Sequence, residues 1–398
     1  MKILVCNAGS TSLKFKLMEM PRETVLCEAK VERVGSESSA IYAYTNLIRN
    51  KKDFRENLCV PDYETGIRIF LSSMTAPESG VLDSVAELDG IGYKTVISKG
   101  FYGVHELTED VMQGMREHLF IAPVHNKAYL DAITQFKAIL PEIPMIGVFE
   151  TAFHTTIPEE HKLYSVPYEW YEKYGIMKMG YHGASHEYVS QKAKSFGKAE
   201  YMISCHLGGS CSICAILNGK SVDSSFGFSL QTGVMHANRS GDIDPYIIPY
   251  LSDQGMAMED ILHSLSSNGG LLGLSGVSND LRDIMLAKKE GNKRAKLAVD
   301  AFVNNIVQYI GAFYAELGGL DQLVFTGGIG ENSGEIRGMV CDALCHMGVL
   351  LDTEENAVSR DGVISQPGSK VVVSVIPANE EIGIARKTYS VVCRPKPR

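Results

Sequence analysis

The sequence has no surplus of basic residues and no long apolar run, and each absence excludes a class of protein. Its 398 residues include 47 acidic and 38 basic side chains, which give a net charge of −9. A dedicated nucleic-acid-binding protein would carry excess positive charge. No apolar segment approaches the roughly 20 residues of a membrane-spanning helix, and the polar stretch 7–10 interrupts the N-terminal apolar run too early for a signal peptide. We therefore expect a soluble, cytoplasmic protein that binds neither nucleic acid nor membranes.

A disulfide framework is also missing. The nine cysteines are an odd number in a chain without a secretion signal, which favours reduced thiols. Cys211 and Cys214 have the spacing of a zinc or redox pair, but they also fit a buried strand. Cys341 and Cys345 would lie one turn apart on a helix, and their spacing does not suit a zinc knuckle. The strand and helix interpretation is therefore favoured over a metal site.

An internal repeat organises the chain. Gly9–Leu13 recurs as Gly209–Ile213, at an offset of 200 residues, and each copy joins two apolar strand-like runs. The remaining pattern alternates between strands and helices, which is typical of α/β layers. We expect helices over 124–140, 185–196 (with Ser185 as N-cap) and 293–317, strands over 144–149 and 322–326, and a flexible loop over 269–276. The length and the repeat together predict two similar α/β domains that face each other.

Three loops rich in Gly, Ser or Asn follow predicted strands, at 7–12, 206–212 and 326–332. Glycine lets the backbone approach a ligand closely, and consecutive amides in such turns can bind phosphate oxygens. Hydroxyls such as those of Ser10 and Ser12 add donors. Ordinary turns have the same composition, and neither a strict P-loop nor a strict Rossmann motif is present. The recurrence of these loops after strands favours phosphate binding.

Several charged residues lie near these loops. Lys14, Lys94, Arg239 and Arg282 are candidate phosphate cations, although Arg239 could instead pair with a nearby aspartate. His182 precedes a predicted helix and could donate to phosphate, form a metal pair with His186, or be structural. Glu150 ends a buried strand, where it could orient an attacking group or hold Mg²⁺ through water, and Glu380 could face a metal or only the helix dipole.

Six segments taken together resemble the acetate kinase family, in family order and over essentially the whole chain. They are Met1–Lys14, Thr151–His154, Gly180–His186, Asn238–Pro245, Phe325–Asn332 and Ile376–Glu381. The resemblance implies an α/β fold of two duplicated ribonuclease H-like domains, of the actin/sugar-kinase/Hsp70 type, that flank a nucleotide cleft. It implies a homodimer that transfers phosphate reversibly between ATP and a short carboxylate, with Mg²⁺ or alternatively Mn²⁺. The expected domains are 1–150 with the C-terminal helix 383–398, on the acyl side, and 151–382, for nucleotide binding and dimerisation.

The resemblance also implies roles for individual residues. Glu150, His182 and Arg239 would be catalytic, and Asn7 and Glu380 would serve the metal. The carboxylic acid substrate would contact Lys94, Val96, Val124, Tyr181 and Leu230. The nucleotide would contact Ser10, Ser12, Lys14, His206, Leu207, Gly208, Gly209, Ser210, Asp280, Leu281, Arg282, Gly328, Ile329, Gly330, Glu331 and Asn332.

The sequence departs from the family pattern mainly on the acyl side. The family usually has arginine at the position of Lys94, which offers a point charge instead of a planar two-point fork. Further departures are Ser98–Phe101 in place of His-Gly-Gly-Glu, Glu150 in place of Asp, Tyr181 in place of Phe, Gly209 in place of Asn and Leu230 in place of Pro. We therefore expect a diverged acetate-kinase-like enzyme. The alternatives are an ATP-binding paralogue that lost the chemistry and regulates a partner, and a kinase that prefers propionate or butyrate.

Overall fold

The computed structural model describes residues 1–394, apart from the side chains at 123 and 124. The chain divides into two compact units, Met1–Ala152 with Asn379–Arg398 and Phe153–Ala378. This division places residues 151–152 and 379–382 with the N-terminal unit, whereas the expected second domain was 151–382. Residues 395–398 of the expected segment 383–398 lie outside the described residues.

The N-terminal unit is built on one eight-stranded sheet in the order β5-β4-β3-β2-β1-β6-β8-β7. Strands β1 to β5 form an antiparallel meander, β6 and β8 run parallel to β1, and β7 is antiparallel to β8. The strands are β1 (Lys2–Gly9), β2 (Ser12–Glu19), β3 (Thr24–Glu32), β4 (Ser36–Asn46), β5 (Lys51–Val60), β6 (Gly90–Thr95), β7 (Val104–Glu106) and β8 (Met145–Phe149).

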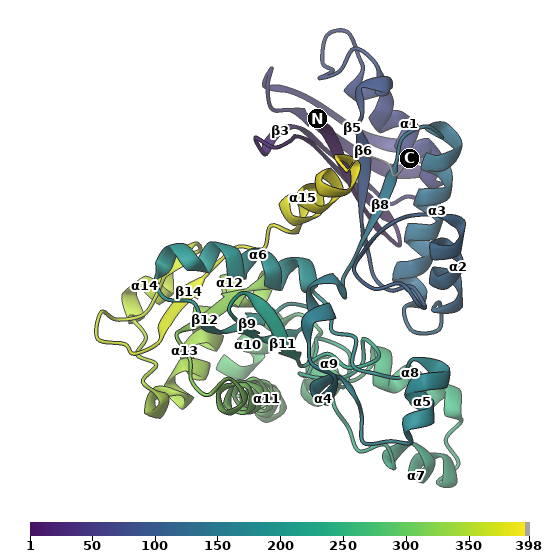
Figure 1. Ribbon diagram of the computed structural model, residues 1–398. Coiled ribbons are helices and arrows are strands. Elements are labelled where there is room, and N and C mark those ends of the chain that lie inside the picture. Colours follow the sequence, from purple (N-terminus) through teal and green to yellow (C-terminus); the bar gives the residue numbers. More distant parts are fainter. Residues whose placement is uncertain (395–398) are drawn as a thin grey trace. The chain divides into compact units, whose positions relative to one another are not determined.

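Helices cover both faces of this sheet (Figure 1). Helices α1 (Tyr63–Met74) and α3 (Pro123–Ile139) contact one face, and α2 (Glu109–Glu117) packs on α3. The C-terminal helix α15 (Glu380–Val392) contacts β1, β6 and β8 on the other face. There Ile384 and Ala385 share a core cluster with Ile3 and Val5. The C-terminal helix therefore supplies part of the hydrophobic core of the unit that begins the chain.

The second unit has a six-stranded sheet, β11-β10-β9-β12-β14-β13, which repeats the order of strands β3-β2-β1-β6-β8-β7 of the first. Its first strands, β9 and β10, form an antiparallel pair like β1 and β2, and β12 is parallel to β9 as β6 is to β1. The predicted duplication is thereby confirmed. The strands are β9 (Tyr201–His206), β10 (Ser212–Leu217), β11 (Lys220–Ser224), β12 (Gln322–Thr326), β13 (Gly362–Val363) and β14 (Val372–Val375).

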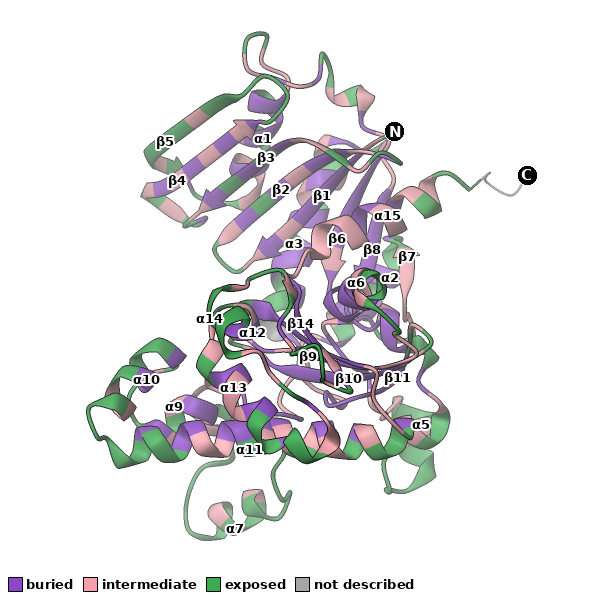
Figure 2. Cartoon of the chain, turned by 90° about the vertical axis from the view of Figure 1, so that its left-hand side faces the viewer, coloured by how far each residue is buried: buried purple, intermediate pink, exposed green. Residues whose placement is uncertain are grey.

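The central strands of this second sheet are buried, and helices pack on both faces (Figure 2). The long helix α11 contacts β9 and β10 on one face, and α6 contacts β9 and β12. The helices are α4 (Glu159–Lys162), α5 (Tyr168–Tyr174), α6 (Gly183–Ala193), α7 (Ile247–Asp253), α8 (Met258–Ser267), α9 (Gly270–Ser275), α10 (Leu281–Lys289), α11 (Lys293–Leu317), α12 (Gly327–Asn332), α13 (Gly334–Ala343) and α14 (Thr353–Val358). No helix within residues 1–394 is long and apolar enough to cross a membrane.

Two local predictions had opposite outcomes. Helix α11 spans the predicted residues, because Asn292 caps its N-terminus and Gly318, at φ 74°, ends it in the left-handed conformation. The expected loop at 269–276 is wrong, because Gly270–Ser275 form helix α9. Leu271 lies in the same buried core as α11 and its backbone N–H donates to His236 O. Tertiary burial therefore gives a fixed structure to a glycine-rich segment.

Candidate functional site

In the N-terminal unit, Lys94 lies between two carboxylates. It lies on β6, Glu150 directly follows the neighbouring parallel strand β8, and Glu380 begins α15. Lys94 Nζ is 2.8 Å from Glu150 Oε1 and 2.5 Å from Glu380 Oε2. Burial opposes the charge on this ammonium, but the two carboxylates outweigh it and hold the pKa of Lys94 well above its usual value. The predicted catalytic and metal-facing carboxylates are thus brought together by the predicted substrate-binding lysine.

Asn7 and a tyrosine that sequence analysis missed belong to the same cluster. Tyr129 on α3 donates to Asn7 Oδ1 at 2.7 Å. Burial raises the pKa of Tyr129, the charge of Lys94 lowers it, and those of Glu150 and Glu380 raise it further. Tyr129 lies on a helix that was predicted, but its spacing is that of a core residue, so no sequence signal singled it out.

These oxygen atoms fit a hard divalent cation. Mg²⁺ prefers carboxylate and carbonyl oxygens, and Mn²⁺ shares that preference. Asn7 Oδ1 and the Glu380 carboxylate are of this kind, and Asn379 Oδ1, adjacent to Glu380, is buried with no hydrogen-bond partner within residues 1–394. Lys94 is already a cation on Glu380, so a metal there would share that carboxylate with an ammonium.

The first glycine-rich turn lies between β1 and β2. Asn7 is directly opposite Lys14 in the strand register, and Gly9 is opposite Ser12. Lys14 is exposed, as is Ser10 at the turn. Tyr63 anchors the turn, because its hydroxyl donates to Gly9 O at 2.5 Å. The structure therefore groups Asn7, Lys14 and the two predicted serines at one end of the β1–β2 hairpin.

In the second unit, His182 lies at the start of α6 and faces the equivalent turn. It is the N-cap residue, with φ 55°, so Ser185 is not the cap that the sequence analysis expected. Ser185 instead lies inside the helix, where its Oγ is 2.9 Å from His206 Nδ1. The His182 ring stacks on His206 at 4.1 Å, and His182 Nδ1 is 2.8 Å from Ser212 Oγ. Four side chains, from the start of α6, from β9 and from β10, thus converge at the loop 206–212.

Arg239 reaches the same loop. Its Nη2 donates to Ser210 Oγ at 2.5 Å, and Ala237 N donates to Gly209 O at 3.0 Å. Burial lowers the pKa of the Arg239 guanidinium below its usual value. The aspartates near Arg239 in the sequence, Asp242 and Asp244, have other partners. Asp242 instead accepts from Gly233 N at 2.8 Å, and Asp244 accepts from Tyr246 N at 2.9 Å. His182 and Arg239 are thereby both connected to the loop 206–212.

The third loop, after β12, forms the short helix α12. Ile329 N and Gly330 N donate to Leu207 O at 2.8 and 3.1 Å, so this loop packs on the loop that follows β9. The Glu331 carboxylate accepts from Gly327 N and Ala378 N, each at 3.0 Å. Glu331 therefore ties backbone segments together at the position where nucleotide contact was expected.

Beneath α12 lies a second residue that the sequence did not reveal. Arg337 is fully buried, and burial lowers its pKa to about 10. Its guanidinium donates to Gly330 O at 2.7 Å and Glu331 O at 3.0 Å, and to both Oδ1 and O of Asn356. No motif marked it, because an arginine on an amphipathic helix usually faces water.

The remaining predicted nucleotide and acyl residues are placed as follows. Asp280 caps α10 and accepts from the Arg282 side chain, which is 90% exposed, whereas Leu281 is buried. Tyr181 is buried in the second unit, and its hydroxyl donates to Phe228 O at 2.9 Å. Leu230 is half-buried nearby in sequence. Val96 is buried after β6 in the N-terminal unit, and the side chain of Val124 lies outside the described residues.

Six of the nine cysteines are buried. All nine are free. Cys211 is buried directly before β10, and Cys214 is buried within it. Burial raises the pKa of Cys211 to about 12. The expectation that Cys341 and Cys345 share a helix is wrong, because α13 ends at Ala343 and Cys345 begins a separate 3₁₀ turn, where it is exposed.

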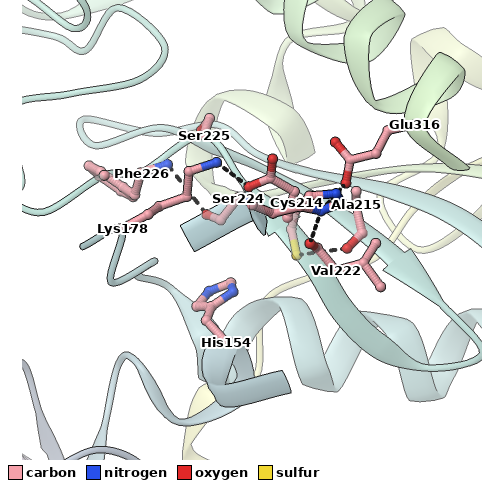
Figure 3. Close-up of polar contacts among 12 residues, drawn as sticks. His154, Lys178, Cys214, Ala215, Val222, Ser224, Ser225, Phe226 and Glu316 are labelled. Atoms are coloured by element: carbon pink, nitrogen blue, oxygen red, sulfur yellow. Dashed lines mark hydrogen bonds and ion pairs between the residues drawn. The ribbon is translucent and has the colours of Figure 1, made fainter. Parts of the chain in front are cut away.

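A separate polar cluster lies beside β11 (Figure 3). Lys178 forms an ion pair with Asp223, and His161 Nδ1 is 2.9 Å from Glu316 Oε1 on α11. Burial, and then the charge of Asp223, raise the pKa of Glu316 to about 7. Among the described residues, His161, Asp223 and Glu316 are the one group of three side chains with metal-ligand spacing. The ammonium of Lys178 already occupies this cluster as its cation.

The chain is similar to known proteins over nearly its whole length. Residues 2–386 match the model of the acetokinase family. The chain is 43% identical over 394 residues to the acetate kinase of Shouchella clausii, covering 97% of this chain and 98% of the relative. Two crystal structures share the fold over 98% of this chain and 99% of theirs. They are Porphyromonas gingivalis acetate kinase (38% identity, TM-score 0.87) and a Francisella tularensis propionate kinase (32% identity, TM-score 0.88).

Proposed function

The chain belongs to the acetokinase family, and we propose that it transfers the γ-phosphoryl group of ATP reversibly to acetate, giving acetyl phosphate and ADP. The acetate kinase relatives, which match nearly the full length, support this activity. The observation that carries it at the site is the convergence of His182 and Arg239 on the loop 206–212. These two donors suit the transferring phosphoryl group.

The chemistry requires mainly positioning and neutralisation of charge. An oxygen of the substrate carboxylate attacks the γ-phosphorus in line, and the bond to the β-bridging oxygen breaks, so that its electrons leave with ADP. Arg239 and His182 would hold the equatorial oxygens of the phosphoryl group. Glu150 would orient these groups instead of acting as a base, because a carboxylate substrate is already ionised at neutral pH.

The nucleotide would lie on the glycine-rich loops. Lys14, Ser10 and Ser12 would contact phosphate in the N-terminal unit. In the second unit the contacts would come from residues 206–210, 280–282 and 328–332. Asn7 and Glu380 would hold Mg²⁺, which supplies charge neutralisation on the phosphate oxygens when bound.

The carboxylate that accepts the phosphoryl group could be longer than acetate. The likeness to a propionate kinase structure gives propionate a specific basis as an alternative acceptor. Val96, Val124, Tyr181 and Leu230 would contact the alkyl chain. Lys94 would bind the carboxylate as a point charge, through the third N–H of an ammonium whose other two face Glu150 and Glu380.

We also propose that the enzyme is a cytoplasmic homodimer. Helices α7 and α8 contact each other and lie among exposed apolar side chains, including Tyr246 (79% exposed), directly before α7, and Tyr250 (65%) on it. Such a patch is typical of an association surface. Light scattering should give the mass of two chains for the native protein. Tyr250→Glu should shift the measured mass toward that of one chain. A monomeric native protein would refute the dimer.

The activity is tested with the full-length protein, ATP, Mg²⁺ and carboxylates of one to five carbons. Hydroxylamine traps any acyl phosphate as a coloured hydroxamate, and an ATP-binding titration is run in parallel. Product with acetate supports the proposal, and a higher kcat/KM with propionate moves the acceptor to three carbons. ATP binding without trapped product from any carboxylate would refute the enzyme and favour the regulatory alternative.

A further inference from the structure

Behind His182 lies a buried chain of side chains that the proposed mechanism does not use. It consists of Ser204 on β9, His186 on α6 and Ser212 on β10, all with 0% exposure. Ser204 Oγ is 2.9 Å from His186 Nδ1, and His186 Nε2 is 2.7 Å from Ser212 Oγ. Ser212 Oγ is in turn 2.8 Å from His182 Nδ1. The chain therefore ends on one defined nitrogen of the proposed catalytic histidine.

Each hydroxyl in this chain has a single hydrogen. Burial lowers the pKa of His186 well below its usual value, so its ring is neutral and carries one N–H. Ser212 touches two imidazole nitrogens and can donate to only one of them. The other imidazole must then donate to Ser212, which leaves two opposite directions for the whole chain.

Ser204 decides between the two directions. Within residues 1–394 its hydroxyl oxygen has no polar partner other than His186 Nδ1. If His186 donated to Ser204, the Ser204 hydroxyl hydrogen would be buried without an acceptor, which is unfavourable. The satisfied arrangement runs from the Ser204 hydroxyl to His186 Nδ1, from His186 Nε2–H to Ser212, and from the Ser212 hydroxyl to His182 Nδ1.

We propose that Ser212 and His186 are positioning residues that fix His182 as the neutral tautomer with its hydrogen on Nε2. Nδ1 of His182 accepts the Ser212 hydroxyl, so Nε2–H is the donor that the ring can present to a phosphoryl oxygen. Stacking on His206 at 4.1 Å holds the ring in its plane. The role in phosphoryl transfer rests on the proposed function, whereas the tautomer itself does not.

The direct test needs no substrate. The full-length protein is labelled with ¹⁵N-histidine, and two-bond ¹H–¹⁵N correlations distinguish protonated from bare ring nitrogens. His182 is assigned by comparison with His182→Gln. We expect a bare, hydrogen-bonded Nδ1 and a protonated Nε2 at neutral pH. A protonated Nδ1, in either the other tautomer or the imidazolium, would overturn the inference whether or not the protein is a kinase.

The kinetic test uses Ser212→Ala, with Ser212→Thr to restore the hydroxyl. Partners that fix an imidazole tautomer contribute substantially to activity, so we expect kcat to fall about 10-fold in the alanine variant. KM for ATP should stay within about twofold, and the threonine variant should recover kcat. Ser190→Ala is the matched control, because Ser190 is equally buried on α6 but donates to Glu187 O.

Equal losses of kcat in the Ser190 and Ser212 variants, or no rescue by threonine, would reduce Ser212 to a packing residue. If Ser212→Ala does not fold, the NMR spectrum of the native protein still decides the tautomer. Absence of acyl phosphate from the native protein would instead refute the proposed function and leave the NMR result intact.

Discussion

Replacing Lys94 by methionine removes the ammonium that two carboxylates share and keeps a side chain of similar length. Glu150 and Glu380 have side chains that are only 6% and 16% exposed, and Lys94 Nζ lies 2.8 and 2.5 Å from them. Removing one partner of a buried ion pair costs about 3–5 kcal/mol. Partial access of solvent to the lysine places the expected loss at the lower end, about 3 kcal/mol at pH 8.

The sign of the pH dependence follows from the same contacts. Without the ammonium, the pKa of each buried carboxyl in the folded variant rises above its unfolded value. A raised carboxyl pKa means that protonation favours the folded state, so the variant should recover stability as the pH falls toward 5. Urea unfolding followed by circular dichroism, at pH 8 and at pH 5, measures both quantities.

Lys99→Met provides the matched control. Lys99 pairs with Glu117 at 2.9 Å, but the two side chains are 54% and 44% exposed. An exposed pair contributes about 0–1 kcal/mol, so this variant should lose little at either pH. If Lys94→Met loses no more than Lys99→Met, or loses the same amount at both pH values, the description of Lys94 as the centre of a buried charge cluster is wrong.

Three further predictions concern the second unit. Arg239→Ala should lower kcat by about 10²–10³-fold, because it removes a donor to the charge that develops in the transition state. The ATP dissociation constant should change only a few-fold. Equal losses in turnover and in ATP affinity, measured by steady-state kinetics and titration, would contradict this role. Glu316→Gln should stabilise the protein by about 1 kcal/mol at pH 8, after allowance for solvent screening, and by little at pH 5. Burial and Asp223 raise the pKa of Glu316 to about 7, so its ionisation opposes folding increasingly as the pH rises to that value. A melting temperature unchanged at pH 8 would argue against this raised pKa. Gly180→Ala should lower the yield of folded protein in expression trials, because Gly180 has φ 67° and its added Cβ would lie 2.5 Å from the His154 ring; normal folding would show that this turn can move.

Much of the fold could be predicted from local patterns. The 25 residues of α11 follow from helical periodicity between an asparagine cap and a glycine stop, and the repeated turn indicated the duplicated sheets. The cap at Ser185 was wrong because His182 takes the left-handed conformation and begins the helix earlier. The expected loop at 269–276 was wrong because burial of Leu271 is a tertiary effect that composition does not contain.

The site was only partly predictable, because some of its contacts arise from the tertiary fold. Residues at the ends of strands, such as His206 at the end of β9 and Glu150 directly after β8, could be placed from the order of the elements. Tyr129 could not, because a tyrosine on an apolar helix face is usually part of the core. The two carboxylates around Lys94 come from positions far apart in the sequence, and only the fold of α15 onto the first sheet brings them together.

The buried arginine beneath α12 has a consequence for how this protein would attract its ligand. All four hydrogen bonds of Arg337 go to neutral oxygens, so among the described residues no carboxylate cancels its charge through a direct bond. Its hydrogen bonds also hold the carbonyls of Gly330 and Glu331 toward the buried guanidinium. A polyphosphate approaching this loop would be drawn by a positive potential whose source it never touches, and salt would screen that attraction less than that of a surface lysine.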